Sequence, residues 1–169
     1  MYGTLIASST VGAGGVSSIS FTSIPGTYTD LIVVISGRTA SSGNDTWTIN
    51  GTTGQNYYAM YANSTTASYY TGTTDTGRST GSGDQANNFG AKSIYIVNYA
   101  SSVYKPFSVN ATAANYNGGF INKYGGVWSN TAAITSLTFT PAGGTFVQYT
   151  TAYLYGVLKG SGGATVTSA

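Results

Sequence analysis

Few side chains in this sequence can transfer a proton, hold a metal ion or act as a nucleophile. The 169 residues contain no His, no Cys and no Glu, and their only acidic side chains are four Asp residues. A Ser, Thr or Tyr hydroxyl needs a neighbouring general base to become a nucleophile, and here only Asp or Lys is available as that base. The composition therefore predicts a protein that is not an enzyme and has no catalytic residue.

One polar segment, residues 71–88, gathers oxygen atoms of the kind that bind Ca²⁺. Asp75 and Asp84 lie in it together with Asn87 and Asn88, but their spacing differs from that of an EF-hand loop. Because almost no apolar side chain anchors the segment, it is typical of a long, solvated surface loop. The sequence thus predicts neither a metal site nor a bound cofactor.

Aromatic side chains form the candidate contact surface. Tyr is the commonest aromatic residue, with 15 copies, and its ring combines a large apolar area with a hydroxyl that tolerates water. Such rings can stack on the faces of sugars, or they can pack between sheets or between subunits, and both interpretations stay open. The clustered candidates are Trp47, Tyr57, Tyr58, Tyr61, Tyr69 and Tyr70.

Charge and hydropathy exclude two kinds of partner. Charged residues make up 6% of the chain and the net charge is +2, whereas about 25% is usual. The cations are scattered, and no basic run could neutralise a row of phosphates, so we expect no nucleic-acid binding. The longest apolar run, residues 31–35, is far short of the roughly 20 residues that cross a bilayer, so we expect no membrane partner.

The elements that must position these side chains are β-strands. β-Branched and aromatic segments alternate with Gly, Pro, Asn and Ser clusters, which is typical of short strands joined by turns. The run at 31–35 indicates a central strand covered on both faces, whereas 46–50 alternates and should expose its threonines. With no helical segment, about ten strands predict an all-β fold, an antiparallel β-sandwich of jelly-roll type, with a closed barrel as the alternative. The other predicted strands are 4–9, 18–21, 57–61, 92–99, 105–111, 134–140 and 151–158.

The length indicates a single domain, residues 1–160, since a chain of this size can bury roughly 70% of its unfolded surface around one core. Residues 161–169 lack apolar periodicity and predict a flexible C-terminal extension. The absence of Cys removes a disulfide framework. Residues 1–4 do not resemble the start of a secretory signal, so we expect synthesis in a cytoplasm.

Four stretches carry a resemblance to a known family: residues 4–15, 19–31, 128–137 and 146–156. They are similar to small β-rich virion proteins and terminal domains of tailed bacteriophages, including phages of cyanobacteria and marine bacteria. The resemblance spans most of the chain. Residues 44–88 depart from it most, so partner or receptor specificity is expected in that region.

The resemblance implies a structural protein of the bacteriophage virion, made in the host bacterial cytoplasm. A free-standing sandwich suits a capsid decoration, or cement, protein. We expect it to stabilise the shell as a homotrimer, by apolar and Tyr-mediated burial against the major capsid protein or other virion proteins. The alternative is a tail-fibre or receptor-binding head domain that contacts host-surface glycan, and a third possibility is a carbohydrate-binding module.

Overall fold

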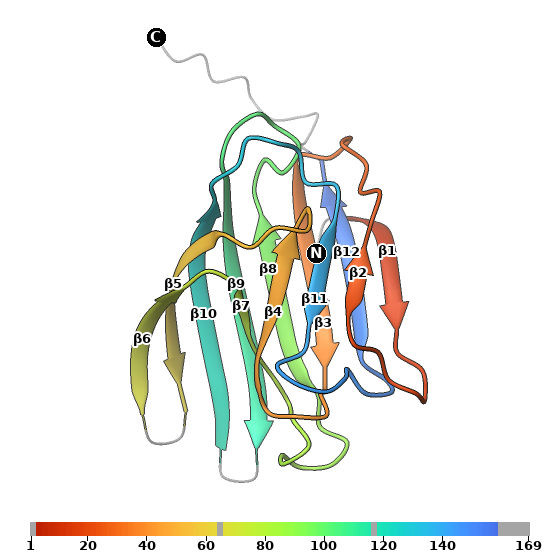
Figure 1. Ribbon diagram of the computed structural model, residues 1–169, viewed down its shortest axis with the longest axis vertical. Helices are drawn as coiled ribbons and strands as arrows, with labels where there is room; N and C mark the ends of the chain where they lie inside the picture. The colour runs from red at the N-terminus through yellow and green to blue at the C-terminus, as the bar shows by residue number, and fades with distance from the viewer. Residues whose placement is uncertain (1–2, 64–65, 116–117, 159–169) are drawn as a thin grey trace.

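The computed structural model describes residues 3–63, 66–115 and 118–158, and in these ranges the chain folds into twelve β-strands (Figure 1). Their bounds are β1 (Thr4–Thr10), β2 (Ile19–Phe21), β3 (Asp30–Gly37), β4 (Gly43–Ile49), β5 (Gln55–Ala62), β6 (Ala67–Gly72), β7 (Asp75–Ser79), β8 (Gly90–Ile96), β9 (Lys105–Asn115), β10 (Gly118–Trp128), β11 (Leu137–Thr140) and β12 (Thr151–Val157). Over the same ranges no helix has the length and apolarity that crossing a membrane requires. The extension expected at 161–169 lies outside the described residues.

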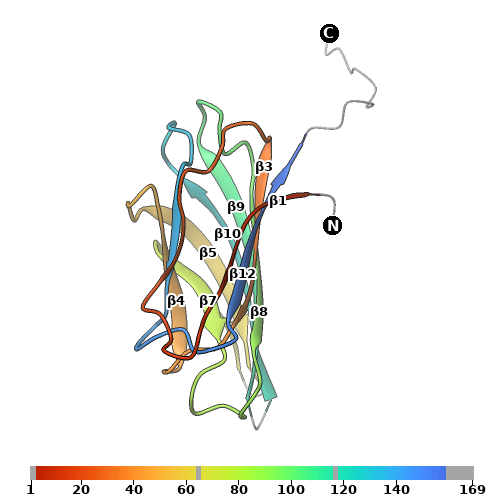
Figure 2. The ribbon, with the colours of Figure 1, turned by 90° about the vertical axis from the view of Figure 1, so that its right-hand side faces the viewer.

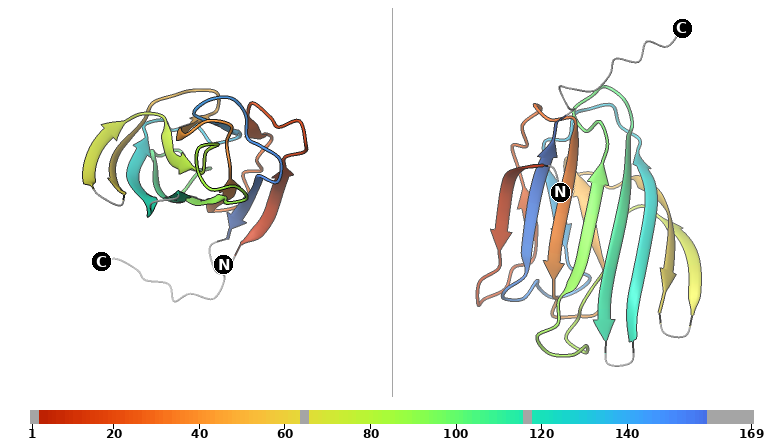
Figure 3. Two further views of the ribbon diagram at one scale, coloured as in Figure 1. Left: turned by 90° about the horizontal axis from the view of Figure 1, so that it is seen from below. Right: turned by 180° about the vertical axis from the view of Figure 1, so that it is seen from behind.

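The strands form two antiparallel sheets that lie face to face (Figure 2). The large sheet has eight strands in the order β1-β12-β3-β8-β9-β10-β5-β6, and the small sheet has four in the order β2-β11-β4-β7. Figure 3 shows the large sheet curling round at β5 and β6. The predicted antiparallel β-sandwich is confirmed, whereas this strand order does not establish jelly-roll connectivity.

The core lies between the two sheets and follows the two-residue period of their strands. In β3 the inward side chains of Leu31, Val33 and Ile35 are buried, while Ile32 and Val34 face outward and stay partly exposed. The expectation that this strand is covered on both faces is therefore wrong, because nothing in the described residues packs fully over the outer face of the large sheet. The apolar run alone could not distinguish the two arrangements.

The segment 71–88 is a surface loop only in part: residues 81–88 carry turns and are mostly exposed, whereas the first half of the segment is strand. It contains β7, which pairs with β4, and three of its hydroxyl residues, Thr76, Ser79 and Thr80, are at most 2% exposed. At Gly77 (φ +82°) an added Cβ would lie 2.7 Å from Ala111 Cβ, so the two sheets approach closely there and a glycine is required. Hydrogen bonds and close backbone packing, rather than apolar anchors, hold this strand.

A buried ion pair connects the two sheets beneath β7. Lys92 Nζ, from β8, lies 2.8 Å from Asp45 Oδ2, from β4, and the two side chains are 2% and 1% exposed. The ammonium also donates to Thr76 Oγ1 at 3.1 Å and to the Gly77 carbonyl at 3.0 Å, and the Ser79 hydroxyl donates to the same carboxylate oxygen. The pair and its hydrogen bonds replace the apolar contacts that β7 lacks.

We expect the variant Lys92→Met to lose about 3–5 kcal/mol of unfolding free energy, because it leaves the Asp45 carboxylate buried without its cation. The double variant Lys92→Met/Asp45→Leu should recover most of that loss, since no charge then remains buried. Urea unfolding of the three proteins measures the difference. The matched control Lys123→Met, at an exposed lysine, should stay within about 0.5 kcal/mol of the wild type. Equal stability of the single and double variants would contradict this role.

Candidate functional site

The six aromatic residues of the candidate contact surface do not lie together. Trp47 and Tyr57 are 1% and 4% exposed, because both occupy inward positions of their strands. The prediction that Trp47 and Tyr57 belong to a contact surface is therefore wrong, because neither side chain is exposed. Trp47 packs between the sheets, with ring centroids 5.1 Å from Phe107 and 6.1 Å from Phe139. Tyr58 and Tyr69, in contrast, are 78% and 84% exposed.

The remaining two candidates, Tyr61 and Tyr70, are half-buried on the inner side of the curl formed by β5 and β6. There Tyr70 packs edge to face against Tyr57 and Tyr124, and its hydroxyl lies 2.6 Å from the Tyr124 hydroxyl. Asn44 Nδ2, from β4, donates to the Tyr70 hydroxyl at 3.2 Å. These side chains support the curl from inside and fix the position of its outer face.

The inner tyrosines are unsuited to proton transfer at neutral pH. Burial raises the pKa of Tyr124 far above its ordinary value of 10.0, and the neighbouring Tyr70 raises it further. Burial also raises the pKa of Tyr57, with the Asp75 carboxylate adding to the effect, and burial raises the pKa of Tyr70. All three hydroxyls therefore remain neutral and act as hydrogen-bonding and packing groups.

The outer face of β10, β5 and β6 gathers large exposed side chains. Tyr58 lies directly opposite Gly125 on β10, and Met60 lies opposite both Lys123 on β10 and Tyr69 on β6. Directly opposed residues share one face of a sheet, so these side chains are neighbours. Met60 is 63% exposed and Ile121 52%. We name this surface the tyrosine face, made of Tyr58, Met60, Tyr69, Ile121 and Lys123.

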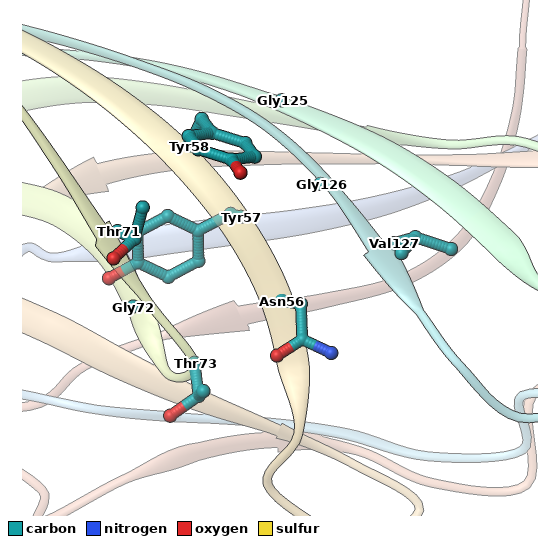
Figure 4. A pocket seen from close by; sticks show the side chains of 9 residues that line it. All are labelled: Asn56, Tyr57, Tyr58, Thr71, Gly72, Thr73, Gly125, Gly126 and Val127. Atoms are coloured by element: carbon teal, nitrogen blue, oxygen red, sulfur yellow. The ribbon is translucent and has the colours of Figure 1, made fainter.

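Three hollows shape the tyrosine face, and one of them, of about 370 Å³, lies between the other two beside Tyr58, Met60, Tyr69 and Lys123. The second has a volume of about 430 Å³ and an apolar lining that Lys123 borders; its outward side chains are Met60, Ala62, Ala67, Tyr69, Ile121 and Lys123. The third is a groove of about 470 Å³ (Figure 4). It passes over the bare backbone of Gly125, where an added Cβ would meet no atom within 4 Å. Its outward side chains are Asn56, Tyr58, Thr71, Thr73 and Val127.

The carboxylates of the segment 71–88 serve the fold. Asp84 Oδ2 accepts a hydrogen bond from the Gly81 N–H at 2.7 Å and one from Arg78 at 3.4 Å. Asp75 Oδ2 instead accepts from Asn44 at 3.4 Å. Across the described ranges, no three residues of the types His, Cys, Asp and Glu group in a way that could hold a metal ion. The binding chemistry of the described surface therefore lies in its aromatic, aliphatic, hydroxyl and amide groups.

Comparisons with known proteins give no relative for this chain. No protein family model matches it, no curated protein sequence matches it, and no solved structure matches it. What the protein binds is therefore inferred from its own surface chemistry, for which the tyrosine face and its hollows provide the geometry.

The raised tyrosine pKa values predict loss of stability in alkali. An unfolded tyrosine ionises near pH 10, whereas the folded protein holds Tyr57, Tyr70 and Tyr124 neutral beyond that pH. These three groups therefore contribute their full amount to the unfolding free energy below about pH 10. Above that pH the unfolding free energy falls by up to about 1.4 kcal/mol per pH unit for each group. Urea unfolding across the alkaline range measures this loss, and Tyr124→Phe should reduce its slope. Stability that stays constant while all tyrosines ionise would contradict the expectation.

Proposed function

We propose that this chain is a structural protein of a bacteriophage virion, a capsid decoration protein that binds the shell through its tyrosine face. The observation that carries the proposal is the contiguous row of large exposed side chains on three adjacent strands, centred on Tyr58, Met60 and Tyr69. Soluble monomers rarely leave such a patch uncovered unless it binds something. Tyr and Met are also enriched at protein interfaces.

The charge pattern supports attachment by apolar burial rather than by ion pairing. Within the described ranges, Lys123 is the one charged residue that lines the hollows of the tyrosine face. Its aliphatic stem can cover apolar surface while the ammonium reaches water at the rim. Because few charges are involved, binding to the shell should depend weakly on salt concentration.

The proposed partner is the major capsid protein or another virion protein, and the proposed location is the virion, assembled in the host bacterial cytoplasm. This context is the one that the sequence resemblance of residues 4–15, 19–31, 128–137 and 146–156 implies. A protein that binds only the assembled shell stabilises that shell by mass action. The mechanism requires a rigid scaffold and an adhesive surface, and no reacting group.

The test is binding of the purified protein to capsid particles that lack it. We expect the double variant Tyr58→Ser/Tyr69→Ser to bind at least about tenfold more weakly, because truncating an aromatic anchor at the centre of an interface costs about 2 kcal/mol or more. The matched control is Tyr149→Ser. Tyr149 is 68% exposed, but it precedes β12, which lies near the opposite edge of the large sheet from β5 and β6. Undiminished binding of the double variant, or a copy number per particle near that of a tail fibre, would overturn the proposal.

A second function is supported by the groove in Figure 4. Tyr58 lies directly opposite Thr71 on β6, and Asn56 lies two residues before Tyr58 on the same face of β5. All three residues line the groove, and Figure 4 shows Asn56 further along it than Tyr58. An aromatic ring next to uncharged hydrogen-bonding groups suits the apolar face and the hydroxyls of a neutral sugar. This geometry favours the receptor-binding head domain, with host-surface glycan as its partner.

Single variants separate the two functions, because the groove and the apolar hollow share no lining residue. Asn56 lines only the groove, and Tyr69 lies outside it. If the protein binds capsid, Tyr69→Ser should weaken binding and Asn56→Ala should not. If it binds glycan, Asn56→Ala should abolish binding on a glycan array while Tyr69→Ser leaves it intact. Circular dichroism of both variants checks that the fold is retained.

A further inference from the structure

The two sheets have four outer edges, and three of them carry features that prevent pairing with another chain. An exposed edge presents unpaired N–H and C=O groups, and natural proteins protect it with bulges, charges or very short strands. In β1 the pairing register shifts between Leu5 and Ala7. β2 is only three residues long. β7 carries Asp75 and Arg78, and its pairing with β4 is also irregular.

The fourth edge, β6, has none of these protections. Its six residues, Ala-Ser-Tyr-Tyr-Thr-Gly, include no charged residue and no Pro, and they pair with β5 in unbroken register. Four of the six, Ala67, Ser68, Tyr69 and Thr71, are exposed. Among the described strands none lies beyond β6, which forms the rim of the curled sheet (Figure 3). Of the four edges, β6 is therefore the one whose backbone N–H and C=O groups can pair with a partner strand without opposition from a charge, a proline or a bulge.

We propose that β6 pairs with β6 of a second copy of this chain, antiparallel and about a two-fold axis normal to the sheet. When an edge strand pairs antiparallel with the same strand of a second copy, both edges are used and the assembly is complete as a dimer. Two-fold dimers are the commonest symmetric oligomers. No charge on β6 opposes its own copy across the axis. The geometry therefore points to a dimer in place of the trimer that the sequence resemblance implies.

The pairing joins the two large sheets into one and brings their tyrosine faces together. Directly opposed residues of paired strands lie on the same face, so the outward row of Ala67, Tyr69 and Thr71 meets the same row of the second copy. We place the two-fold axis at Tyr69, the middle residue of that row, so that Ala67 lies opposite Thr71 of the second copy. Tyr69, 84% exposed in the single chain, then lies opposite Tyr69 of the second copy. Two tyrosine faces become one continuous surface, and a shell with repeated sites would bind it with avidity.

Sedimentation velocity of the full-length protein tests the pairing. We expect the wild type to sediment as a dimer at micromolar concentrations. We expect Ala67→Lys/Thr71→Lys to sediment as a monomer, because edge lysines oppose strand pairing. The matched control Ser8→Lys/Thr10→Lys places two lysines at exposed positions of the bulged edge β1 and should remain a dimer. A wild-type monomer or trimer, or a dimer that survives the β6 lysines, overturns the proposal.

Cysteine cross-linking gives a second readout that does not depend on the stability of the lysine variant. The chain contains no Cys, so a single introduced thiol reports only on its own neighbourhood. Mild oxidation should cross-link Tyr69→Cys into a covalent dimer and leave Ser8→Cys without a covalent cross-link, and failure of Tyr69→Cys to cross-link overturns the pairing. Pairing does not rest on the capsid-binding function. A wild-type monomer that still binds capsid particles through Tyr58 and Tyr69 overturns the dimer alone.

Discussion

The buried ion pair of Lys92 and Asp45 is the interaction on which the rest of this sandwich depends. β7 has no apolar side chain to pack into the core, and its place in the small sheet is held by Lys92 Nζ, which bonds Asp45, Thr76 and the Gly77 carbonyl at 2.8–3.1 Å. Breaking such a pair leaves an uncompensated charge in a low-dielectric interior. Through β4 it also positions Asn44, which contacts Tyr70 and so reaches the curl of β5 and β6.

The tyrosine face is a consequence of alternation along one strand. In β5, Tyr57 and Ala59 point inward while Tyr58 and Met60 point outward. A register shift of one residue would exchange the two sets. The inner Tyr57 packs against Tyr124 with ring centroids 4.9 Å apart, so the strand that presents the outer side chains is fixed from behind. A rigid adhesive surface loses little conformational entropy on binding, which suits a structural protein of a particle.

Scarcity of charge connects the two proposals. The whole chain has four Asp and six basic residues. Several of these charged side chains are buried in the fold, among them Asp45, Asp84 and Lys92. The surface therefore has little electrostatic means of choosing or repelling partners. Apolar burial on the tyrosine face and backbone pairing at β6 are the two forms of association left to it, and both tolerate salt.

The sequence by itself determined the all-β class, because the alternation of apolar and polar residues in segments such as 18–21 and 46–50 has a period that only strands satisfy. It could not reveal β6, β7 or β10. The glycines of β10 resemble turn signals, yet Gly126 lies in a strand that pairs on both sides. Glycine is required there because a Cβ would approach the Phe107 ring to 2.5 Å. Nor could it separate Tyr57 from Tyr58, since both belong to one aromatic run. Only the tertiary structure decided which tyrosines face water, because one face of each strand is buried against the opposite sheet. Neighbouring residues along the chain do not determine which face that is.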